Sequence, residues 1–566
     1  MDYEKNIKEA LSKVLGKKEE ILLEKPKNLE FGDYAFPCFS LAGTYKKNPS
    51  QIALEISEKL NKTKIKGVSK INPAGPYINF IVNKENLTNE IISEIFSKKT
   101  KIVSKNKKSK EKVMIEFSQA NTHKAFHVGH IRGTSMGESL ARIMENQGIA
   151  VIRANYQGDT GMHVAKWLWC YLKYHKKEKL KNDESWIANI YVDAVKKLAG
   201  DETGELQKEV NEINLKLESK KDKKLNELWK KTRLISLQAL EKIYKELNTK
   251  FNVYFFENQV EKEGKDIAKM LVTKNIAKID DKATIIDLKE QGLGVWILLR
   301  GDGSVLYSAK DLVLAMKKFE KYKVDKSIYV VADEQKLHFQ QLFKTLELMK
   351  FKDIKKCKHL EFGLVRLPEG KMSSRTGDNI LYSNFKKEIV EYAKEEIKKR
   401  DSKIGEKELE KRAIVIAIAA IKYSMLKQDP QKVIVFDKEE SLNFEGNTGP
   451  YLLYSYARAS SIIKKAKIKI NLKIKLEKLE DKEINLIKKL GEFKEVTEQA
   501  YKNLDPSTIA NYSFELSQSF NEFYHFYPVL TAEDKIKQQR LAIVEAFRTV
   551  LKQSLGLLGI DVLEEM

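Results

Sequence analysis

The feature that most constrains the fold is an alternation of short apolar runs with segments of helical periodicity. Residues 113–117 and 151–155 have the pattern of short strands, and residues 136–146 between them carry apolar side chains at helical spacing. Strands separated by helices pair in parallel, because a crossover that contains a helix returns the chain in the same direction. The alternation resumes with apolar runs at 284–288 and 328–332. The sequence therefore predicts an α/β domain built on a parallel sheet.

Composition divides the rest of the chain around this domain. Residues 98–112 are almost wholly lysine, serine, asparagine and threonine; they have little to bury, which predicts a linker. A Lys/Glu-rich helical stretch at about 167–250 interrupts the alternation, and we interpret it as an insertion between two halves of the sheet. Past Lys411 amphipathic helices dominate, which predicts an all-α bundle. The expected domains are a small α+β domain at 1–97, the linker at 98–112, the α/β domain at 113–435 and the bundle at 436–566.

Charge and hydropathy limit the partners of the chain. Its 566 residues include 103 Lys and Arg against 80 Asp and Glu, a formal net charge of +23. This balance favours a polyanion such as nucleic acid, because phosphate contacts release counterions. The alternative is a lysine-rich composition that coats every surface with solvated ammonium groups. The apolar runs are too short to cross a bilayer and the N-terminus is charged, so we expect a cytoplasmic protein without a membrane partner.

The cysteines limit the redox and metal chemistry that we expect. The three cysteines, Cys38, Cys170 and Cys357, lie far apart and form no CxxC pair. This usage fits a reducing compartment and argues against a disulfide framework or a structural zinc site. The sequence therefore predicts no protein-held metal.

Two histidines three residues apart, His127 and His130, lie between the first strand of the α/β domain and the helix that follows. The start of a helix favours an anion, and Gly129 leaves room for a flat base or ribose to approach the backbone. Such a site suits ATP, with the imidazoles stabilising charge that develops on the α-phosphate. A chance HxxH pair or a metal site is the alternative. Because no third ligand is nearby and the context is strand–loop–helix, we favour the nucleotide interpretation.

A second signal is the small polar loop 370–377, Gly-Lys-Met-Ser-Ser-Arg-Thr-Gly, with a cation toward each end. Alone it is weak, since a lysine among serines and glycines is usually a surface turn. Together with His127-Val-Gly-His130 upstream, it resembles the HIGH and KMSKS signatures of class I aminoacyl-tRNA synthetases. The resemblance implies that His127 and His130 are catalytic and that Lys371, helped by Ser373, holds the phosphates of ATP.

Further motifs narrow the resemblance to the arginyl-tRNA synthetases, and they occur in order along essentially the whole chain. The resemblance implies a Rossmann-type catalytic domain with a helical insertion, an additional tRNA-binding N-terminal domain and a helical anticodon-binding domain. The motifs are NLEFGDY at 28–34, GPYINF at 75–80, FSQAN at 117–121, HVGHIRGT at 127–134, NYQGD at 155–159, LYSAKD at 306–311 and FEGNTGPY at 444–451.

Acidic and polar residues suit an arginine pocket. A guanidinium group is planar, charged and forked, so a selective site needs carboxylates that accept paired hydrogen bonds. Tyr307 and Asp311 are four apart in a helical segment and therefore share one face. The resemblance implies that Asp311 and Glu257 take the guanidinium, that Tyr307 lines the pocket, and that Asn121 and Gln335 hold the α-amino and carboxyl end. Ordinary surface polarity is the alternative for each residue alone.

Two positions depart from the family pattern. Ser374 stands where the KMSKS signature has its second lysine, so one expected phosphate contact is missing. Family members that lack this lysine use one just before the HIGH motif, and Lys124 is suitably placed; we hypothesise that it binds ATP instead. Thr160 stands where many relatives carry tryptophan, so the resemblance does not fix the local shape of the amino-acid pocket.

The resemblance also implies a tRNA partner. Tyr451 and Tyr454 lie three apart on one predicted helix face, where they can stack on splayed anticodon bases. Tyr524 and Met566 match further anticodon-contacting positions, and a place in the bundle core is the alternative for all three tyrosines. In the N-terminal domain, Asn28 and Phe31 match the positions that read the outer corner of tRNA. The insertion would lie near the acceptor stem.

The resemblance as a whole implies an arginine–tRNA ligase, expected as a monomer, whose partners are L-arginine, ATP and tRNA(Arg). Mg²⁺ would accompany ATP, bound through phosphates and water. Arginine activation would need bound tRNA. One rival is another HxGH enzyme, such as a cysteinyl synthetase or a small-molecule nucleotidylyltransferase; the scattered cysteines argue against the former and the helical module against the latter. The other rival is a non-catalytic RNA-binding paralogue, against which the intact His127, His130, Lys371, Glu257 and Asp311 argue.

Overall fold

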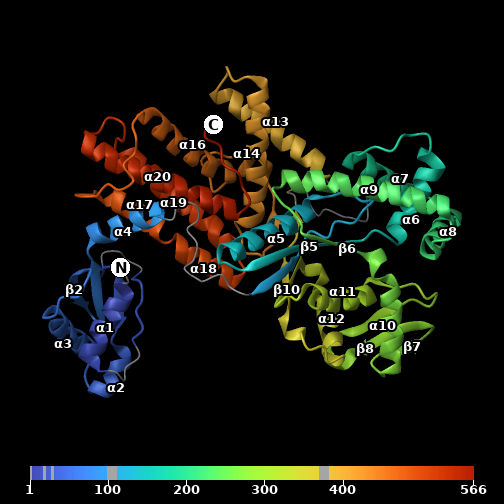
Figure 1. Ribbon diagram of the computed structural model, residues 1–566, viewed down its shortest axis with the longest axis horizontal. Coiled ribbons are helices and arrows are strands. Elements are labelled where there is room, and N and C mark those ends of the chain that lie inside the picture. The colour runs from blue at the N-terminus through green and yellow to red at the C-terminus, as the bar shows by residue number, and fades with distance from the viewer. Residues whose placement is uncertain (1–2, 17–20, 27–30, 98–110, 367, 369–380) are drawn as a thin grey trace. The chain divides into compact units, whose positions relative to one another are not determined.

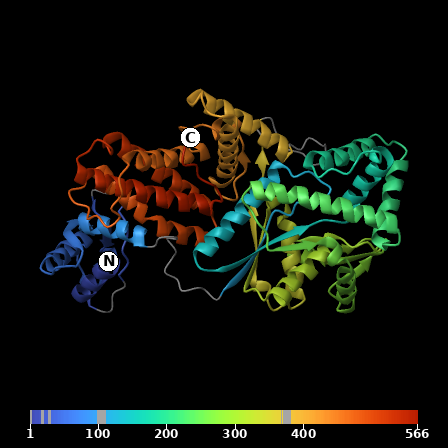
Figure 2. The same ribbon diagram turned by 45° about the horizontal axis from the view of Figure 1, so that its top comes forward.

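The chain divides into two compact units in the computed structural model (Figures 1 and 2). The helices at 436–566 are shared between the units, so the domain ranges drawn from composition stay a prediction. The first unit spans Met1–Thr100, Ile462–Glu492 and Gln518–Val550, and the second spans Lys101–Ser461, Phe493–Ser517 and Leu551–Met566. The residues that the structure describes are 3–16, 21–26, 31–97, 111–366, 368 and 381–566.

Five strands form the central sheet of the second unit, and every neighbouring pair is parallel. Their order across the sheet is β11-β10-β4-β5-β6. This is a doubly wound order. The chain starts at β4 in the middle and runs outward through β5 to β6 at one edge. It then returns to β10 on the other side of β4 and ends at β11, the opposite edge. The predicted α/β fold class is confirmed. The strands are β4 (Lys112–Glu116), β5 (Ala150–Gln157), β6 (Val253–Phe256), β10 (Lys326–Ala332) and β11 (Cys357–Phe362).

Helices cover both faces of this sheet (Figure 2). Met114 of β4 packs with Leu314 on one face, whereas its neighbour Val113 lines a pocket with Met144 on the other. The helix that carries Met144 approaches the end of β4 closely, because a Cβ at Gly137 would lie 2.1 Å from the ring of Phe117. The helices on the two faces are α5 (Val128–Asn146), α11 (Tyr307–Tyr322) and α12 (Lys336–Leu348).

The apolar run at 284–288 is a strand, but the expectation that it continues the parallel alternation was wrong. It lies in a separate antiparallel sheet of order β7-β8-β9. Asp281 and Lys282, with φ of 40° and 61°, form the two-residue link between the first two strands, and so short a link permits only antiparallel pairing. The elements of this region are α10 (Glu261–Thr273), β7 (Lys278–Asp280), β8 (Ala283–Leu288) and β9 (Gly294–Leu299).

Between β5 and β6 the chain leaves the sheet for a group of helices, where the Lys/Glu-rich stretch predicted an insertion. These helices have an apolar core of their own, which includes Trp167, Ile190 and Val210. The first helix continues directly into a π-helical turn, η3. The elements are α6 (Met162–Cys170), η3 (Tyr171–His175), α7 (Glu184–Ala199), α8 (Glu205–Ser219) and α9 (Lys223–Glu246).

The N-terminal part of the first unit is a small mixed fold. Three antiparallel strands in the order β1-β3-β2 pack against helices through a core that includes Leu11, Phe36, Ile52 and Phe80. The elements are α1 (Tyr3–Leu15), β1 (Tyr34–Pro37), η2 (Phe39–Leu41), α2 (Ala42–Tyr45), α3 (Pro49–Asn61), β2 (Val68–Ala74), β3 (Tyr77–Val82) and α4 (Lys84–Ser97).

The last third of the chain is helical, as the amphipathic patterns indicated, apart from two very short strands. Gly449 begins one helix in close contact with another, since a Cβ there would lie 2.3 Å from the carbonyl oxygen of Ala419. The elements are β12 (Val365–Arg366), α13 (Tyr382–Arg400), α14 (Glu406–Leu426), β13 (Ile434–Val435), α15 (Lys438–Ser441), α16 (Gly449–Ala466), α17 (Asp481–Gly491), α18 (Phe493–Asn503), α19 (Ser507–Phe526) and α20 (Asp534–Leu557).

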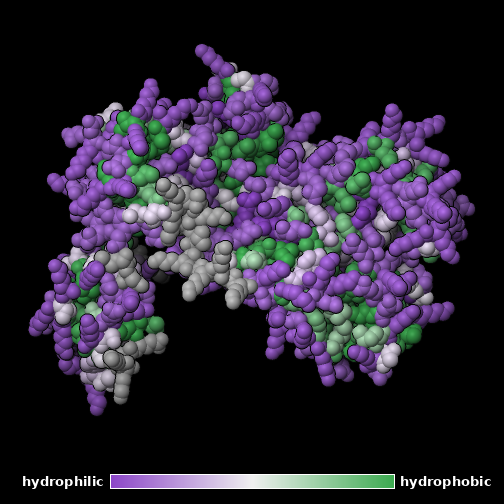
Figure 3. All heavy atoms as spheres, in the orientation of Figure 1, coloured by the Kyte–Doolittle hydropathy of each residue, from purple (hydrophilic) through white to green (hydrophobic). Residues whose placement is uncertain are grey.

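Hydrophilic side chains cover most of the face drawn in Figure 3, and hydrophobic ones show through in separate patches. Within the described ranges, every helix is too short or too polar to cross a membrane.

Candidate active site

Several predicted site residues of the second unit lie at the carboxyl ends of the parallel strands, whereas Tyr307 and Asp311 lie in the first turns of α11, after β9. Asn121 and His127 lie in the loop after β4, and Glu257 directly follows β6. Gln335 ends the short 3₁₀ turn η6 (Asp333–Gln335) after β10. The chain reverses its direction across the sheet between β4 and β10, and open α/β sheets bind ligands in the crevice at such a point.

The histidine pair stands at the N-terminus of α5. His127 is the residue that caps this helix, and its backbone N–H donates to Nδ1 of His130 at 3.2 Å. The two ring centroids are 3.9 Å apart, and the ring of His130 also stacks on Phe126 at 5.1 Å. A Cβ on Gly129 would lie 3.0 Å from the ring of His127. The glycine therefore lets the imidazole of His127 pack against the first turn of α5, and its predicted contact with a nucleotide stays a prediction.

Both imidazoles are neutral at physiological pH. Burial, followed by the charge of Lys124, lowers the pKa of His127 to about 4. Burial, His127 and Lys124 hold the pKa of His130 well below its usual value. Because Nδ1 of His130 accepts a hydrogen bond, the proton of its neutral ring is on Nε2. This leaves Nε2 as a hydrogen-bond donor for an oxygen at the helix terminus.

Gly158, in the loop after β5, brings two predicted arginine ligands together. Its N–H donates to Oδ1 of Asn121 at 3.0 Å. A Cβ in its place would lie 2.6 Å from Oδ1 of Asn121 and 3.1 Å from Oε1 of Glu257. Only glycine permits this contact, so the glycine of the NYQGD motif is required by the pocket rather than by a turn.

The two predicted guanidinium ligands already carry cationic or hydrogen-bonding partners. Glu257 pairs with Nζ of Lys310 at 2.8 Å, and Oδ2 of Asp311 meets Nε2 of His338 at 2.7 Å. The other oxygen of Asp311, Oδ1, is buried and has no hydrogen-bond partner among the described residues. Burial raises the pKa of Glu257, an effect opposed by Lys310 and reinforced by Asp311. The two carboxylates therefore lie within electrostatic reach of each other.

Tyr156 is a pocket residue that the sequence analysis did not select, although it lies in the NYQGD motif. Its hydroxyl is buried and has no hydrogen-bond partner in the part of the chain described. Burial raises its pKa well above 10, and four carboxylates then add to the effect. Besides Glu257 and Asp311 these are Asp159, paired with Arg233 at 2.7 Å, and Glu116, paired with Lys318 at 2.7 Å.

Other predicted ligands are more exposed or fall outside the description. Tyr307 is 53% exposed and places its ring 4.8 Å from that of His338. The side chain of Gln335 is exposed. Nζ of Lys124 lies 5.4 Å from the ring centroid of Tyr191, and burial and then Lys166 lower its pKa. Lys371, Ser373 and Ser374 lie outside the described residues.

The predicted tRNA contacts are distributed over several elements. On α16 the ring of Tyr451 is 5.5 Å from that of Phe514, and the hydroxyl of Tyr454 accepts a hydrogen bond from Arg458 at 3.0 Å. Tyr524 on α19 is 41% exposed. In the first unit Phe31 is 52% exposed. Met566 is partly exposed at the end of the chain, and Asn28 lies outside the described residues.

A parallel sheet of this order, with a histidine pair at its switch point, matches the catalytic domain of a class I tRNA synthetase. Residues 91–437 match the family model described as "tRNA synthetases class I (R), catalytic domain". Residues 1–82 match "Arginyl tRNA synthetase N terminal domain", and residues 452–566 match "DALR anticodon binding domain".

Individual arginine–tRNA ligases and a solved structure are similar to this chain over its whole length. It is 36% identical over 573 aligned residues to the arginine–tRNA ligase of Clostridium acetobutylicum and 35% identical to that of Clostridium perfringens, with 100% of each chain covered. It is similar to the solved structure of Thermus thermophilus arginyl-tRNA synthetase, with a TM-score of 0.80, 25% identity and 99% and 100% coverage. The chain therefore belongs to the arginyl-tRNA synthetase family.

Proposed function

We propose that this chain is an arginine–tRNA ligase, which uses ATP to form arginyl-adenylate and then transfers arginine to the 3′ end of tRNA(Arg). The observation that supports this most directly is that Glu257 lies within electrostatic reach of Asp311 and of Lys124, and that Lys124 in turn acts on His127 and His130. The two carboxylates suit the guanidinium group of the amino acid, and the two histidines suit the phosphates of ATP. Membership of the family supports the same reaction.

The guanidinium of arginine binds between Glu257 and Asp311 in this proposal. Asp311 offers the buried oxygen Oδ1, which has no protein partner among the described residues, and a guanidinium N–H is the donor that such an oxygen favours. Lys310 and His338 contact the same two carboxylates. Before arginine binds, these contacts keep the carboxylates of Glu257 and Asp311 from being unpaired buried charges, which would destabilise the fold. In this proposal Tyr307 covers the solvent side of the arginine pocket, and the buried hydroxyl of Tyr156 forms part of the pocket wall.

The α-amino and carboxyl end of arginine points toward the switch point. The carbonyl of Asn121 is occupied by the N–H of Gly158, which leaves its NH₂ group as a donor to the carboxylate. Gln335 lies on the other side of the switch point, after β10. These two residues would fix the carboxylate oxygen for attack on the α-phosphorus.

His127 and His130 act on ATP. The attacking carboxylate oxygen forms a bond to the α-phosphorus, and the bond to the bridging oxygen breaks to release pyrophosphate. Negative charge develops on the α-phosphate during this step, and neutral imidazole N–H groups at the positive end of α5 stabilise it. Gly129 lets the nucleotide approach, and Lys371 and Ser373 are proposed to hold the β- and γ-phosphates. A terminal ribose hydroxyl of tRNA then attacks the acyl carbon, and AMP leaves.

Mg²⁺ is proposed to enter with ATP. The carboxylates nearest the strand ends, Glu116, Asp159, Glu257 and Asp311, each contact a basic side chain already. They do not form a set of free oxygen ligands, and Mg²⁺ keeps several waters when it binds through substrate phosphates. The ion would neutralise phosphate charge, and the residues above would position the reactants.

tRNA(Arg) is proposed to contact the helical C-terminal region and the N-terminal domain. Tyr451, Tyr454, Tyr524 and Met566 are the proposed anticodon contacts, because aromatic rings stack on unpaired bases. Asn28 and Phe31 are proposed to read the outer corner of the tRNA. We propose that the chain acts as a cytoplasmic monomer.

Pyrophosphate exchange tests this function. The purified chain should exchange labelled pyrophosphate into ATP when arginine and tRNA(Arg) are both present, and far more slowly without the tRNA. Lysine is the matched control, because it is a cation of similar length that cannot offer a forked guanidinium. No exchange under any condition would leave a non-catalytic RNA-binding protein, and exchange with another amino acid would identify a different synthetase.

A further inference from the structure

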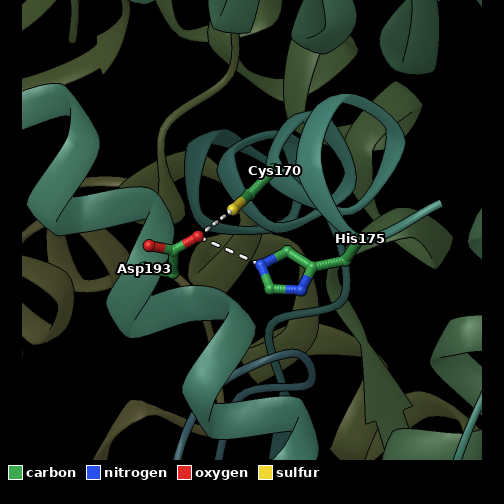
Figure 4. Close-up of side chains that lie close together, drawn as sticks. All are labelled: Cys170, His175 and Asp193. Carbon is green, nitrogen blue, oxygen red and sulfur yellow. Dashed lines mark hydrogen bonds and ion pairs between the residues drawn. The ribbon is translucent and has the colours of Figure 1, made fainter. Parts of the chain in front are cut away.

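Three side chains with metal-binding atoms, none of them among the residues proposed for catalysis, meet in the helical insertion. They are Cys170 at the end of α6, His175 at the end of η3 and Asp193 on α7 (Figure 4). Sγ of Cys170 lies 3.4 Å from Oδ2 of Asp193, and Nε2 of His175 lies 3.0 Å from the same oxygen. All three candidate ligand atoms lie within 4.8 Å of one another.

The π-helical turn explains why Cys170 and His175 face the same point. An α-helix turns 100° per residue, so residues five apart would point about 140° away from each other. The turn η3, Tyr171–His175, has i→i+5 hydrogen bonding instead, which turns the chain less per residue and brings residues five apart toward the same side of the helix. π turns inside α-helices are frequent at functional sites.

We propose that Cys170, His175 and Asp193 bind one zinc ion. Zinc–ligand distances are about 2.3 Å for sulfur and about 2.0–2.1 Å for nitrogen or oxygen, and the preferred geometry is tetrahedral. A tetrahedron with those distances places sulfur about 3.5 Å from oxygen and nitrogen about 3.3 Å from oxygen. The observed separations of 3.4 Å and 3.0 Å are within a few tenths of an ångström of these edges. A mixed thiolate, imidazole and carboxylate set suits zinc better than magnesium or calcium.

Glu178 supplies the support that a metal-bound histidine needs. Its Oε1 meets Nδ1 of His175 at 2.6 Å, and its other oxygen accepts a hydrogen bond from Nε1 of Trp186 at 2.8 Å. This contact fixes the ring so that Nε2 points toward Cys170 and Asp193. A carboxylate that holds the second nitrogen of a histidine is a regular feature of zinc sites.

The surroundings indicate a structural role for this site. Cys170 is fully buried in the core of the insertion, whereas the side chains of His175 and Asp193 are 23% and 34% exposed. An ion could therefore enter from the His175 and Asp193 side and join α6 and η3 to α7. Without metal, the same three side chains satisfy one another by hydrogen bonds, and Asp193 also meets Lys197 at 3.7 Å. Metal binding displaces the thiol proton of Cys170 and the Nε2 proton that His175 directs at Asp193, and both protons are released to solvent.

The lack of a CxxC pair among the three cysteines predicted no protein-held metal. The ligands here are one cysteine, a histidine five residues later and an aspartate on the next helix. A spacing of five residues indicates two ligands on the same side of a helix only if the helix contains a π turn, which the sequence does not reveal. The proposal is thus a revision of the sequence-based expectation.

Cobalt titration of the purified, metal-free full-length chain tests the site. We expect one Co²⁺ per chain, with a sulfur-to-cobalt charge-transfer band and the intense visible absorption of tetrahedral cobalt, and stoichiometric displacement by Zn²⁺. Cys170→Ser should abolish the charge-transfer band. Cys357→Ser is the matched control and should keep it, because Cys357 lies on β11 in the parallel sheet.

Two further variants test the site independently, in case Cys170→Ser does not fold. Asp193→Asn changes a partly exposed side chain and should weaken zinc binding at least tenfold. Glu178→Gln should weaken it about 10- to 100-fold while the charge-transfer band persists at saturation. The proposal is overturned if cobalt gives no charge-transfer band, if the band survives in Cys170→Ser, or if Asp193→Asn binds zinc as tightly as the wild type.

Discussion

At the scale of single residues, Lys124 stands between the two halves of the proposed active site. Its charge contributes to the lowered pKa of both His127 and His130, and Glu257 acts on Lys124 in turn. Lys124 is therefore within electrostatic reach of both the nucleotide residues and the arginine carboxylates. This position is the one expected of a lysine that replaces the missing second lysine of the 370–377 loop.

Replacement of Lys124 by alanine tests that role. We expect the rate of arginyl-adenylate formation to fall about 100-fold, because a cation aimed at developing phosphate charge is removed. Lys166→Ala is the matched control, since Lys166 is the neighbouring lysine that acts on the pKa of Lys124, and it should change the rate by less than about threefold. Single-turnover measurement of adenylate formation gives both rates. An unchanged rate in Lys124→Ala would place the compensating cation elsewhere.

Buried histidines make stability depend on pH. His123 is fully buried, with its two ring nitrogens against the hydroxyls of Thr122 and Thr232, and burial lowers its pKa to about 3. Between pH 6.5 and 3 the unfolded chain binds a proton at this ring and the folded chain does not. The free energy of unfolding therefore decreases as the pH falls through this window, by up to about 1.4 kcal/mol per pH unit.

The variant His123→Gln should lose this part of the pH dependence. Between pH 6.5 and 5.0 we expect denaturant unfolding of the wild type to lose about 2 kcal/mol more than the variant loses. The variant should be less stable than the wild type at pH 7, because it removes a buried ring. Parallel loss of stability in the two proteins over this range would show that His123 does not remain neutral.

Motifs could predict Glu257 and Asp311 but not their partners. The sequence marks both acids because they match one family's pocket. Lys310 could have been suspected from its place in the LYSAKD motif, whereas nothing in the sequence indicates that His338 reaches Asp311. Such contacts depend on how α11 and α12 pack, and packing is a property of the fold rather than of local spacing.

At the scale of elements, Arg132 joins α5 to two distant loops. It is fully buried and donates hydrogen bonds to the carbonyl oxygens of Gly363, Leu364, Asp429, Pro430 and Lys432. No carboxylate bonds it within the described ranges; its charge is balanced by carbonyl dipoles. The loop that contains Gly363 and Leu364 leads into β12 and then toward residues 370–377. The helix that begins with the histidine pair is therefore tied to the segment that leads into β12.

Arg132→Met should be strongly destabilising. It removes the donor from the carbonyl oxygens of Gly363 and Lys432, whereas those of Leu364, Asp429 and Pro430 keep backbone N–H donors. At about 1–3 kcal/mol for each carbonyl that water cannot reach, a total loss of about 2–6 kcal/mol is expected. Arg300→Met is the matched control, because Arg300 is exposed and its loss should change stability by less than about 0.5 kcal/mol. Differential denaturant unfolding measures both. Equal stability of the two variants would mean that the carbonyl groups find other donors.

Periodicity predicted elements better than it predicted their pairing. The apolar runs at 113–117, 151–155 and 328–332 are strands of the parallel sheet, because their length and β-branched content suit full burial. The run at 284–288 has the same composition but belongs to an antiparallel sheet. The difference is set by the two-residue turn at Asp281 and Lys282, whose positive φ values no apolar pattern reveals.

At the scale of the whole molecule, the net charge of +23 and the family membership favour the same class of partner. Charge alone left solvated lysines as an alternative, because it does not say which surfaces meet an anion. The order of motifs along the chain predicted the family, and the family models that match its three parts show it. The division into compact units, by contrast, cuts across the C-terminal helices, and composition gives no sign of such a division.

The most direct test of the proposed specificity compares arginine with citrulline, its neutral isostere, in tRNA-dependent pyrophosphate exchange. Wild-type enzyme should favour arginine by at least about 1000-fold in kcat/KM, equivalent to about 4 kcal/mol. The double variant Glu257→Gln/Asp311→Asn should lose most of this preference, whereas Asp287→Asn, an acid on β8 that pairs with Lys278, should keep it. Activation of citrulline by the wild type as efficiently as arginine, or full preference in the double variant, would contradict selection of arginine by these two carboxylates.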